Sequence, residues 1–188
     1  MNSQVIKVPG LSNRKQTKII LLICVAIFLG ITSVAQDLEV PGVAEIRAEF
    51  NTINEDHGLK KLVLENEEFM ENVTDGGGTL TCWYKKDMIV KIVEWIGLSY
   101  GNTSREFYFK GGKLIFIYCK VCNFVQKDND DLDYAKTMTA FEGRYYIKDN
   151  KIIKVVINQW AEIEMGKDIL DNKIADGEKY FKMLSKEK

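Results

Sequence analysis

Residues 107–118 read FYFKGGKLIFIY and contain the strongest structural signal in the chain. An aromatic and apolar run precedes the pair Gly111-Gly112, and a second apolar run follows it. Glycine readily adopts the positive φ that both central residues of a type I′ turn require, and this turn matches the twist of two antiparallel strands. The stretch therefore predicts a β-hairpin with a two-residue loop.

Two further segments align with this hairpin without a gap. Residues 82–93 read CWYKKDMIVKIV, and residues 145–156 read YYIKDNKIIKVV. A lysine precedes the turn in all three copies, and Lys-Asp and Asp-Asn occupy the turn positions 86–87 and 149–150. The chain is therefore predicted to contain three tight hairpins, which make six strands.

The pairing of the strands predicts two sheet faces. If the strands pair without a bulge, Phe109 lies opposite Leu114. Phe107 then lies opposite Phe116 on the same face, which we expect to form the core. The second face is not polar either, so either the chain's own helices and loops cover it or it binds a partner. The residues predicted to bind a partner on this face are Trp83, Tyr108 and Tyr146.

One helix is predicted before the hairpins and another after them. Residues 43–54 place Ile46 and Ile53 at helical spacing, with charged residues between them. Residues 163–184 show a similar period, and glycines such as Gly177 leave open whether they form one helix or two short ones. The expected fold class is α+β: an antiparallel β-meander sheet of about six strands, flanked by an N-terminal and a C-terminal helix.

The first 35 residues have the order of a secretory signal peptide. Four basic and no acidic residues precede the apolar run 19–31, and Ser33 and Ala35 stand at the small positions before a cleavage site. The apolar run has 13 residues, against about 20 for a spanning helix. We therefore expect residues 1–35 to be a signal peptide, residues 36–188 to form a single α+β domain without a stable membrane span, and the protein to be periplasmic or secreted.

Composition restricts the classes of partner. The 188 residues carry 26 basic and 27 acidic side chains, and 46% of the residues are hydrophobic, which suffices for one core. Removal of the four basic residues of the leader leaves 22 basic against 27 acidic side chains, a net charge of −5. An acidic domain is not expected to bind nucleic acid.

The motif Cys119-Lys120-Val121-Cys122 suggests chemistry, because CxxC occurs in thiol redox sites and as half of many zinc sites. The motif continues an apolar strand, where residues three apart point to opposite faces about 10 Å apart. Cys82 makes the count in the mature chain odd, and an exported protein can form disulfides. Three interpretations stay open: buried thiols, a disulfide of Cys82 with Cys119 or Cys122, and a redox or metal site.

Other polar motifs do not complete a catalytic or metal site. Residues 128–133, DNDDLD, lack the EF-hand glycine, and residues 76–78, GGG, lack the lysine of a phosphate-binding loop. His57 has acidic neighbours but no nucleophile motif. We expect no catalytic residues, no metal and no cofactor.

Three segments resemble those of a loose group of small exported proteins of Gram-negative bacteria with repeated aromatic β-hairpins. These are the helix pattern Ile46-Arg47-x-x-Phe50-x-x-Ile53-Asn54, EFYFKGGKLIFIY and GRYYIKDNKIIKVV, and the junction at residues 33–36 is also similar. The resemblance covers about residues 43–160, implies export, and brings no activity and no functional residues.

The leading hypothesis is a non-catalytic periplasmic module that binds a protein or a cell-envelope component through its aromatic-rich sheet face. The alternatives are a thiol redox or metal-binding protein that uses Cys119 and Cys122, and an inhibitor of a secreted enzyme.

Overall fold

The computed structural model describes residues 40–128, 131–159 and 167–186, and the chain from Val40 onward forms one compact unit. The expected signal peptide, residues 1–35, lies outside the described residues. No helix within the described ranges is long and apolar enough to cross a membrane.

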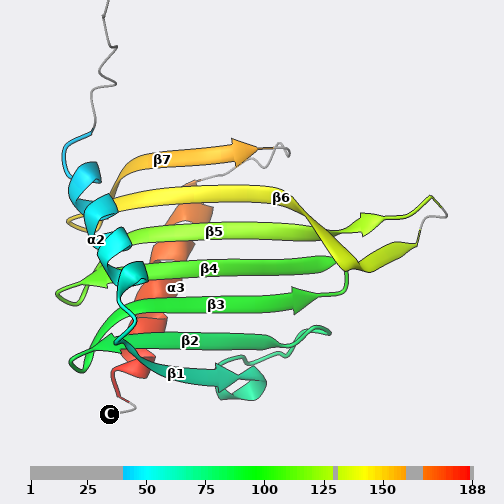
Figure 1. Ribbon diagram of the computed structural model, residues 1–188, viewed down its shortest axis with the longest axis horizontal. Coiled ribbons are helices and arrows are strands. Elements are labelled where there is room, and N and C mark those ends of the chain that lie inside the picture. Colours follow the sequence, from blue (N-terminus) through cyan, green and yellow to red (C-terminus); the bar gives the residue numbers. More distant parts are fainter. Residues whose placement is uncertain (1–39, 129–130, 160–166, 187–188) are drawn as a thin grey trace, which may run out of the picture. The chain divides into compact units, whose positions relative to one another are not determined.

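Seven antiparallel strands form one sheet, in which every strand lies beside its neighbour in sequence (Figure 1). The strands are β1 (Lys60–Glu65), β2 (Gly78–Lys85), β3 (Met88–Leu98), β4 (Gly101–Lys110), β5 (Lys113–Gln126), β6 (Leu132–Lys148) and β7 (Lys151–Gln159). The predicted meander is therefore confirmed, with one strand more than the six of the hairpins. The added strand is β1, whose alternating Leu62 and Leu64 pack against the core. A short 3-10 helix, η1 (Asn66–Glu68), follows β1.

The three hairpins have the predicted two-residue turns. Both turn residues have positive φ in each copy: 47° and 64° at residues 86–87, 56° and 75° at residues 111–112, and 49° and 57° at residues 149–150. These values belong to type I′ turns, in which aspartate and asparagine tolerate the left-handed region and glycine adopts it without strain.

Each hairpin also contains a bulge that the sequence did not predict. The extra residue is Val90 in the first copy, Ile115 in the second and Ile153 in the third. The bulge shifts the pairing by one residue, so Phe107 lies opposite Ile117 and not opposite the predicted Phe116. A bulge inserts one residue into one strand and increases its twist, and a simple alternation pattern does not reveal it.

One helix packs on each face of the sheet (Figure 1). The N-terminal helix α2 (Val43–Glu55) and the C-terminal helix α3 (Lys167–Leu184) confirm the predicted flanking helices. Helix α3 continues through Gly177. The glycine lets the helix lie close to the sheet, because a Cβ at this position would come within 2.6 Å of Phe107 Cδ1. The expected start of this helix at residue 163 lies outside the described residues.

The sheet therefore has a core on both sides. The α3-side core joins Tyr180 and Leu184 of the helix to strand residues such as Phe107 and Ile117. The α2-side core joins Val43, Ile46 and Ile53 to Val90, Tyr108, Phe116 and Tyr146. Because the bulge at Ile115 changes the alternation, Phe116 and Ile117 each pack on the face opposite to the one expected.

Candidate functional site

The structure buries two of the three aromatic residues predicted to form a partner-binding face. Tyr108 is 0% and Tyr146 is 5% exposed. The ring of Phe50, on α2, lies 4.8 Å from that of Tyr108, and the Arg47 guanidinium carbon lies 5.6 Å from the centre of the Tyr146 ring. The apolar side of α2 covers both residues, so neither is accessible to a partner.

Tyr108 also has polar contacts typical of a structural residue. Its hydroxyl donates to Glu106 and lies 3.2 Å from Asn54 Oδ1. Burial, together with the charge of Glu106, raises the pKa of Tyr108 well above its ordinary value. The hydroxyl is therefore neutral and links the sheet to α2.

Trp83, the third predicted residue, is only partly buried. The Nζ atoms of Lys61 and Lys91 lie 6.0 Å and 5.4 Å from the centre of a Trp83 ring. These lysines restrict access to the indole, so Trp83 lies at the margin of the uncovered surface.

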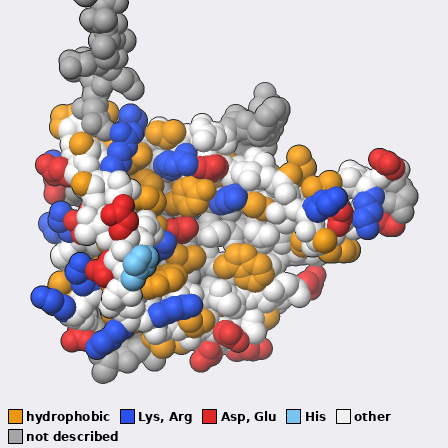
Figure 2. Space-filling view, in the orientation of Figure 1, with side chains coloured by type: hydrophobic (Ala, Val, Ile, Leu, Met, Phe, Trp, Pro, Cys, Tyr) orange, Lys and Arg blue, Asp and Glu red, His pale blue; other side chains and the backbone are white. Residues whose placement is uncertain are grey.

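Among the described residues, α2 leaves part of its side of the sheet uncovered, and we call this part the open face. Helix α2 crosses the strands near their hairpin turns, and hydrophobic side chains gather on the sheet beyond it (Figures 1 and 2). Trp95 is 38% exposed there. The strand register places the apolar and aromatic residues of the open face together: Val63, Val93, Trp95 and Tyr118.

Charged pairs lie among the residues of the open face. Lys91 Nζ lies 2.9 Å from Glu106 Oε2, and Arg144 forms an ion pair with Glu142. The Arg144 guanidinium also lies 5.5 Å from the centre of the Tyr118 ring. The open face thus combines accessible aromatic side chains with locally neutralised charges.

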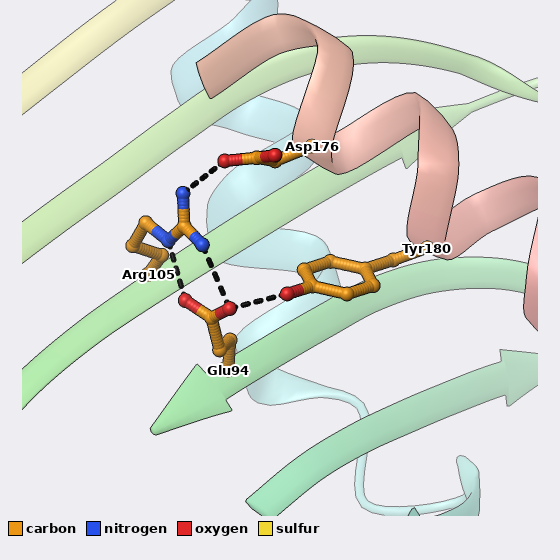
Figure 3. A network of polar contacts seen from close by, with 4 residues as sticks. All are labelled: Glu94, Arg105, Asp176 and Tyr180. Carbon is orange, nitrogen blue, oxygen red and sulfur yellow. Dashed lines mark hydrogen bonds and ion pairs between the residues drawn. The ribbon is translucent and has the colours of Figure 1, made fainter. Parts of the chain in front are cut away.

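The α3-side face contains a buried polar network (Figure 3). Glu94, on β3, is 4% exposed and accepts two hydrogen bonds from Arg105 on β4, one of them at 2.7 Å. The Tyr180 hydroxyl donates to Glu94, and Arg105 also forms an ion pair with Asp176. Asp176 and Tyr180 are four residues apart and lie on one side of α3. The network therefore joins α3 to two neighbouring strands.

The network determines the charge states of its members. Burial alone would lower the pKa of the Arg105 guanidinium, but hydrogen bonds and charges of Glu94 and Asp176 outweigh burial and raise it. Burial and the charge of Glu94 raise the pKa of Tyr180. Arg105 is thus positively charged and Tyr180 neutral, as these hydrogen bonds require.

A cavity of about 320 Å³ lies beside the network on the same face. Its apolar wall is formed by Ile96, Val121 and Phe141, and its polar side includes Arg105 and Lys173. Sequence analysis did not find this cavity.

All three cysteines of the described chain are buried thiols. Cys119 lies on the α3 side, and burial raises its pKa to about 11. Cys82 lies on β2, separated from β5 by two strands, so the bridges from Cys82 would have to span about 14 Å. Cys119 and Cys122 point to opposite faces of β5. A disulfide requires Cα atoms within about 7 Å, so this sheet is not compatible with the bridges considered from the sequence.

Metal ligands do not converge within the described ranges: they contain no group of three or more His, Cys, Asp or Glu residues that could hold a metal ion. His57 is exposed just beyond the end of α2. Neither a family model, nor a curated protein, nor a solved structure matches the chain.

The buried network was missed, although the sequence contains a signal for it. Glu94 stands between Ile92 and Ile96 in a strand of alternating residues, so it belongs to an apolar face. Arg105 stands two residues before Phe107 and shares its face. A charged residue at a core position requires a partner, and two such residues on adjacent strands predict a pair.

Proposed function

We propose that this chain is an exported, non-catalytic binding module and that its open face binds a protein partner. The observation that carries the proposal is the exposed indole of Trp95 on the open face, the part of the sheet that α2 leaves uncovered.

The proposal of export rests on the leader. A basic segment, a short apolar run and a small-x-small junction occur in the order that signal peptidases recognise. Intact mass of the protein recovered from the periplasm or the medium tests this part. A chain that begins at Gln36 supports export with cleavage after Ala35, and a chain found only in the cytoplasm with its leader intact refutes it.

The environment of the buried ionisable groups supports a non-catalytic role. Glu94 and Arg105 satisfy one another, and among the described residues no buried side-chain nitrogen or oxygen lacks a hydrogen-bond partner. The thiol of Cys119, with a pKa of about 11, is protonated at neutral pH, whereas redox and nucleophilic cysteines depend on the thiolate. The environment of these groups therefore favours a role in stabilising the fold over a role in proton or electron transfer.

The chemistry of the open face favours a protein as its occupant. Protein interfaces are enriched in tryptophan, tyrosine and arginine, and a few such residues supply most of the binding energy. Trp95, Tyr118 and Arg144 have this composition. The arm formed by the ends of β5 and β6 carries the exposed side chain of Tyr134. Tyr134 is 70% exposed although its ring contacts that of Phe124.

Site-specific photo-crosslinking tests the proposed face. A photoreactive amino acid replaces Trp95 in one variant and Val155, which is 39% exposed on the α3 side, in the other. In cells, a discrete adduct with one protein is expected from position 95 and not from position 155. The same protein should bind Trp95→Lys at least tenfold more weakly than wild type, and Val155→Lys with unchanged affinity.

The outcomes separate the candidate functions. Adducts that are equal at both positions, or absent at position 95, refute the proposal that the open face binds a protein partner. A partner that is a secreted enzyme and loses activity in the complex would make the chain an inhibitor. Reversible oxidation of Cys119 and Cys122 under mild conditions would instead support the redox alternative.

A further inference from the structure

Three polar side chains meet where the last turn of α2 contacts the sheet. The Lys91 Nζ atom, on β3, lies 2.9 Å from Asn54 Oδ1, on α2. The same Nζ atom lies 2.9 Å from Glu106 Oε2, on β4. The Tyr108 hydroxyl lies 3.2 Å from Asn54 Oδ1 and also contacts Glu106. One amine is therefore in contact with both a carboxamide and a carboxylate.

The amine of Lys91 lies among aromatic rings and has little contact with water. Its Nζ atom is 4.9 Å from the centre of the Tyr108 ring and 5.4 Å from that of a Trp83 ring. The side chain of Lys91 is 15% exposed, and that of Glu106 is 23% exposed. Charged groups are costly where water is scarce. Transfer of a proton from Lys91 to Glu106 replaces two such charges by a neutral amine and a neutral acid.

The neutral amine has an electrophile beside it. A lysine amine that has lost its proton is a nucleophile, and the carbonyl carbon of the Asn54 side chain is its neighbour. Once Glu106 is protonated, the Tyr108 hydroxyl can donate to Asn54 Oδ1 instead, where negative charge develops during attack. The fold holds these groups together before the reaction, which lowers its entropic cost.

We propose that Lys91 and Asn54 form an intramolecular isopeptide bond, with Glu106 as the proton carrier. The Lys91 Nζ atom attacks Asn54 Cγ, the Nζ–Cγ bond forms and the Cγ–Nδ2 bond breaks. The Nζ ammonium group gives up two protons through Glu106, and these leave with the Nδ2 amide group as an ammonium ion. No oxidant or other reactant is required. The reaction occurs once in each chain and does not depend on a protein partner.

The bond fixes α2 to the sheet. Asn54 and Lys91 are 37 positions apart in the chain, and a cross-link between distant residues restricts the unfolded chain. Helix α2 covers Tyr108 and Tyr146, so a bond at its last turn also fixes the boundary of the open face.

Intact mass tests the reaction. Loss of ammonia should lower the mass of the wild-type chain by about 17 Da relative to its sequence. Cyclisation of glutamine in a chain that begins at Gln36 also releases ammonia, so the reference is Lys91→Arg with the same N-terminus. Arginine keeps the positive charge but stays protonated, so this variant should not show the additional loss. In wild type, a pair of tryptic peptides joined through Asn54 and Lys91 should locate the bond.

Two variants test the proton carrier and the specificity. Glu106→Gln keeps the shape of the side chain but cannot take the proton, so the bond should not form. Lys110→Arg is the matched control: Lys110 Nζ lies 2.8 Å from Glu49 Oε2, also on α2, but its side chain is 62% exposed. This variant should lose ammonia as wild type does.

Thermal unfolding measures the effect of the bond. Lys91→Arg should lower the melting temperature by about 10 °C, as loss of a cross-link of this span implies, and Lys110→Arg should leave it nearly unchanged. Circular dichroism at 20 °C verifies that each variant is folded, and the comparison of wild type with Lys91→Arg decides if Glu106→Gln does not fold. The proposal is overturned if wild type and Lys91→Arg show the same mass deficit, if folded Glu106→Gln forms the bond, or if the joined peptides connect other residues.

Discussion

Replacement of Glu94 by alanine should destabilise the protein more than any single change at its surface. The substitution leaves Arg105 with Asp176 as its one remaining anion among the described residues and removes the acceptor of the Tyr180 hydroxyl. Loss of one partner from a buried ion pair costs about 3–5 kcal/mol. The Arg105 side chain is 24% exposed, so water solvates part of its charge, and we expect the lower value, about 3 kcal/mol. Native domains have only about 5–15 kcal/mol of stability, so this loss is large.

Replacement of the whole network should cost much less. In Glu94→Leu/Arg105→Met/Tyr180→Phe no buried charge and no buried hydroxyl is left unpaired, and Asp176, with 37% of its side chain exposed, returns to water. Apolar residues that replace a buried ion pair are often neutral or stabilising. The triple variant should therefore lie within about 1 kcal/mol of wild type.

Urea denaturation followed by circular dichroism measures both free energies, provided that the slope with urea concentration stays constant. Lys60→Ala is the matched control, since its pair with Asp87 spans 3.9 Å and both side chains are about 80% exposed. It should change stability by less than about 0.5 kcal/mol. The reasoning is refuted if Glu94→Ala costs under 1 kcal/mol, or if the triple variant is as unstable as Glu94→Ala.

Three further predictions concern the helix contact, the buried thiol and the turn. Gly177→Ala gains about 1 kcal/mol of helix propensity. Its Cβ, however, would lie 2.6 Å from a ring atom of the fully buried Phe107, and overpacking costs about 1–3 kcal/mol. Thermal unfolding should show a net loss, and a higher melting temperature would contradict this contact. The Cys119 thiol ionises near pH 9.0 when unfolded and near pH 11 in the fold. Below pH 9.0 the thiol is protonated in both states, and its contribution to the free energy of unfolding is complete. As the pH rises from 9.0 towards 11, the thiol ionises in the unfolded state first, and this lowers the free energy of unfolding by roughly 3 kcal/mol. Urea denaturation of wild type and Cys119→Ala across this window should show a smaller loss in the variant, and equal losses would assign the effect to other groups. Gly111→Ala places a Cβ at a φ of 56° and should cost about 1 kcal/mol, which D-alanine at the same position should restore. Equal stability of the two alanine variants would refute the type I′ assignment.

Local chemistry made the hairpins and the flanking helices predictable. The dipeptides at positions 86–87, 111–112 and 149–150 accept positive φ, and this property does not depend on the rest of the chain. The N-terminal helix was recognisable because its apolar residues repeat with the helical period. From the sequence, residues 62–64 could form either a short helix or a strand within a linker, because the six residues of β1 are too few for the period to distinguish the two.

The faces of the sheet were less predictable. A single inserted residue, Ile115, moves Phe116 to the α2 side and Ile117 to the α3 side. The same one-residue insertion recurs in the other two hairpins, so the bulge is part of the repeated unit. A bulge depends on the twist of the paired strand, and the sequence of one strand does not contain that information.

The predicted partner-binding residues differ from the accessible ones for a related reason. Tyr108 and Tyr146 are aromatic residues on a second apolar face, and the sequence left open whether a helix or a partner covers them. Helix α2 packs on them because its own apolar side must be buried, and only the docking of the helix determines how far along the strands this cover extends. The exposed residue Trp95 lies beyond that limit.

The sequence by itself determined the turns, the order of the six hairpin strands and the two flanking amphipathic helices. These are local properties, set by backbone preference and by the period of apolar residues. Only the tertiary structure decided which faces are covered, that Glu94 and Arg105 meet Asp176 and Tyr180, and that a cavity opens beside Lys173. These properties arise because the packing of a helix on a twisted, bulged sheet brings together residues 71 and 86 positions apart in the chain.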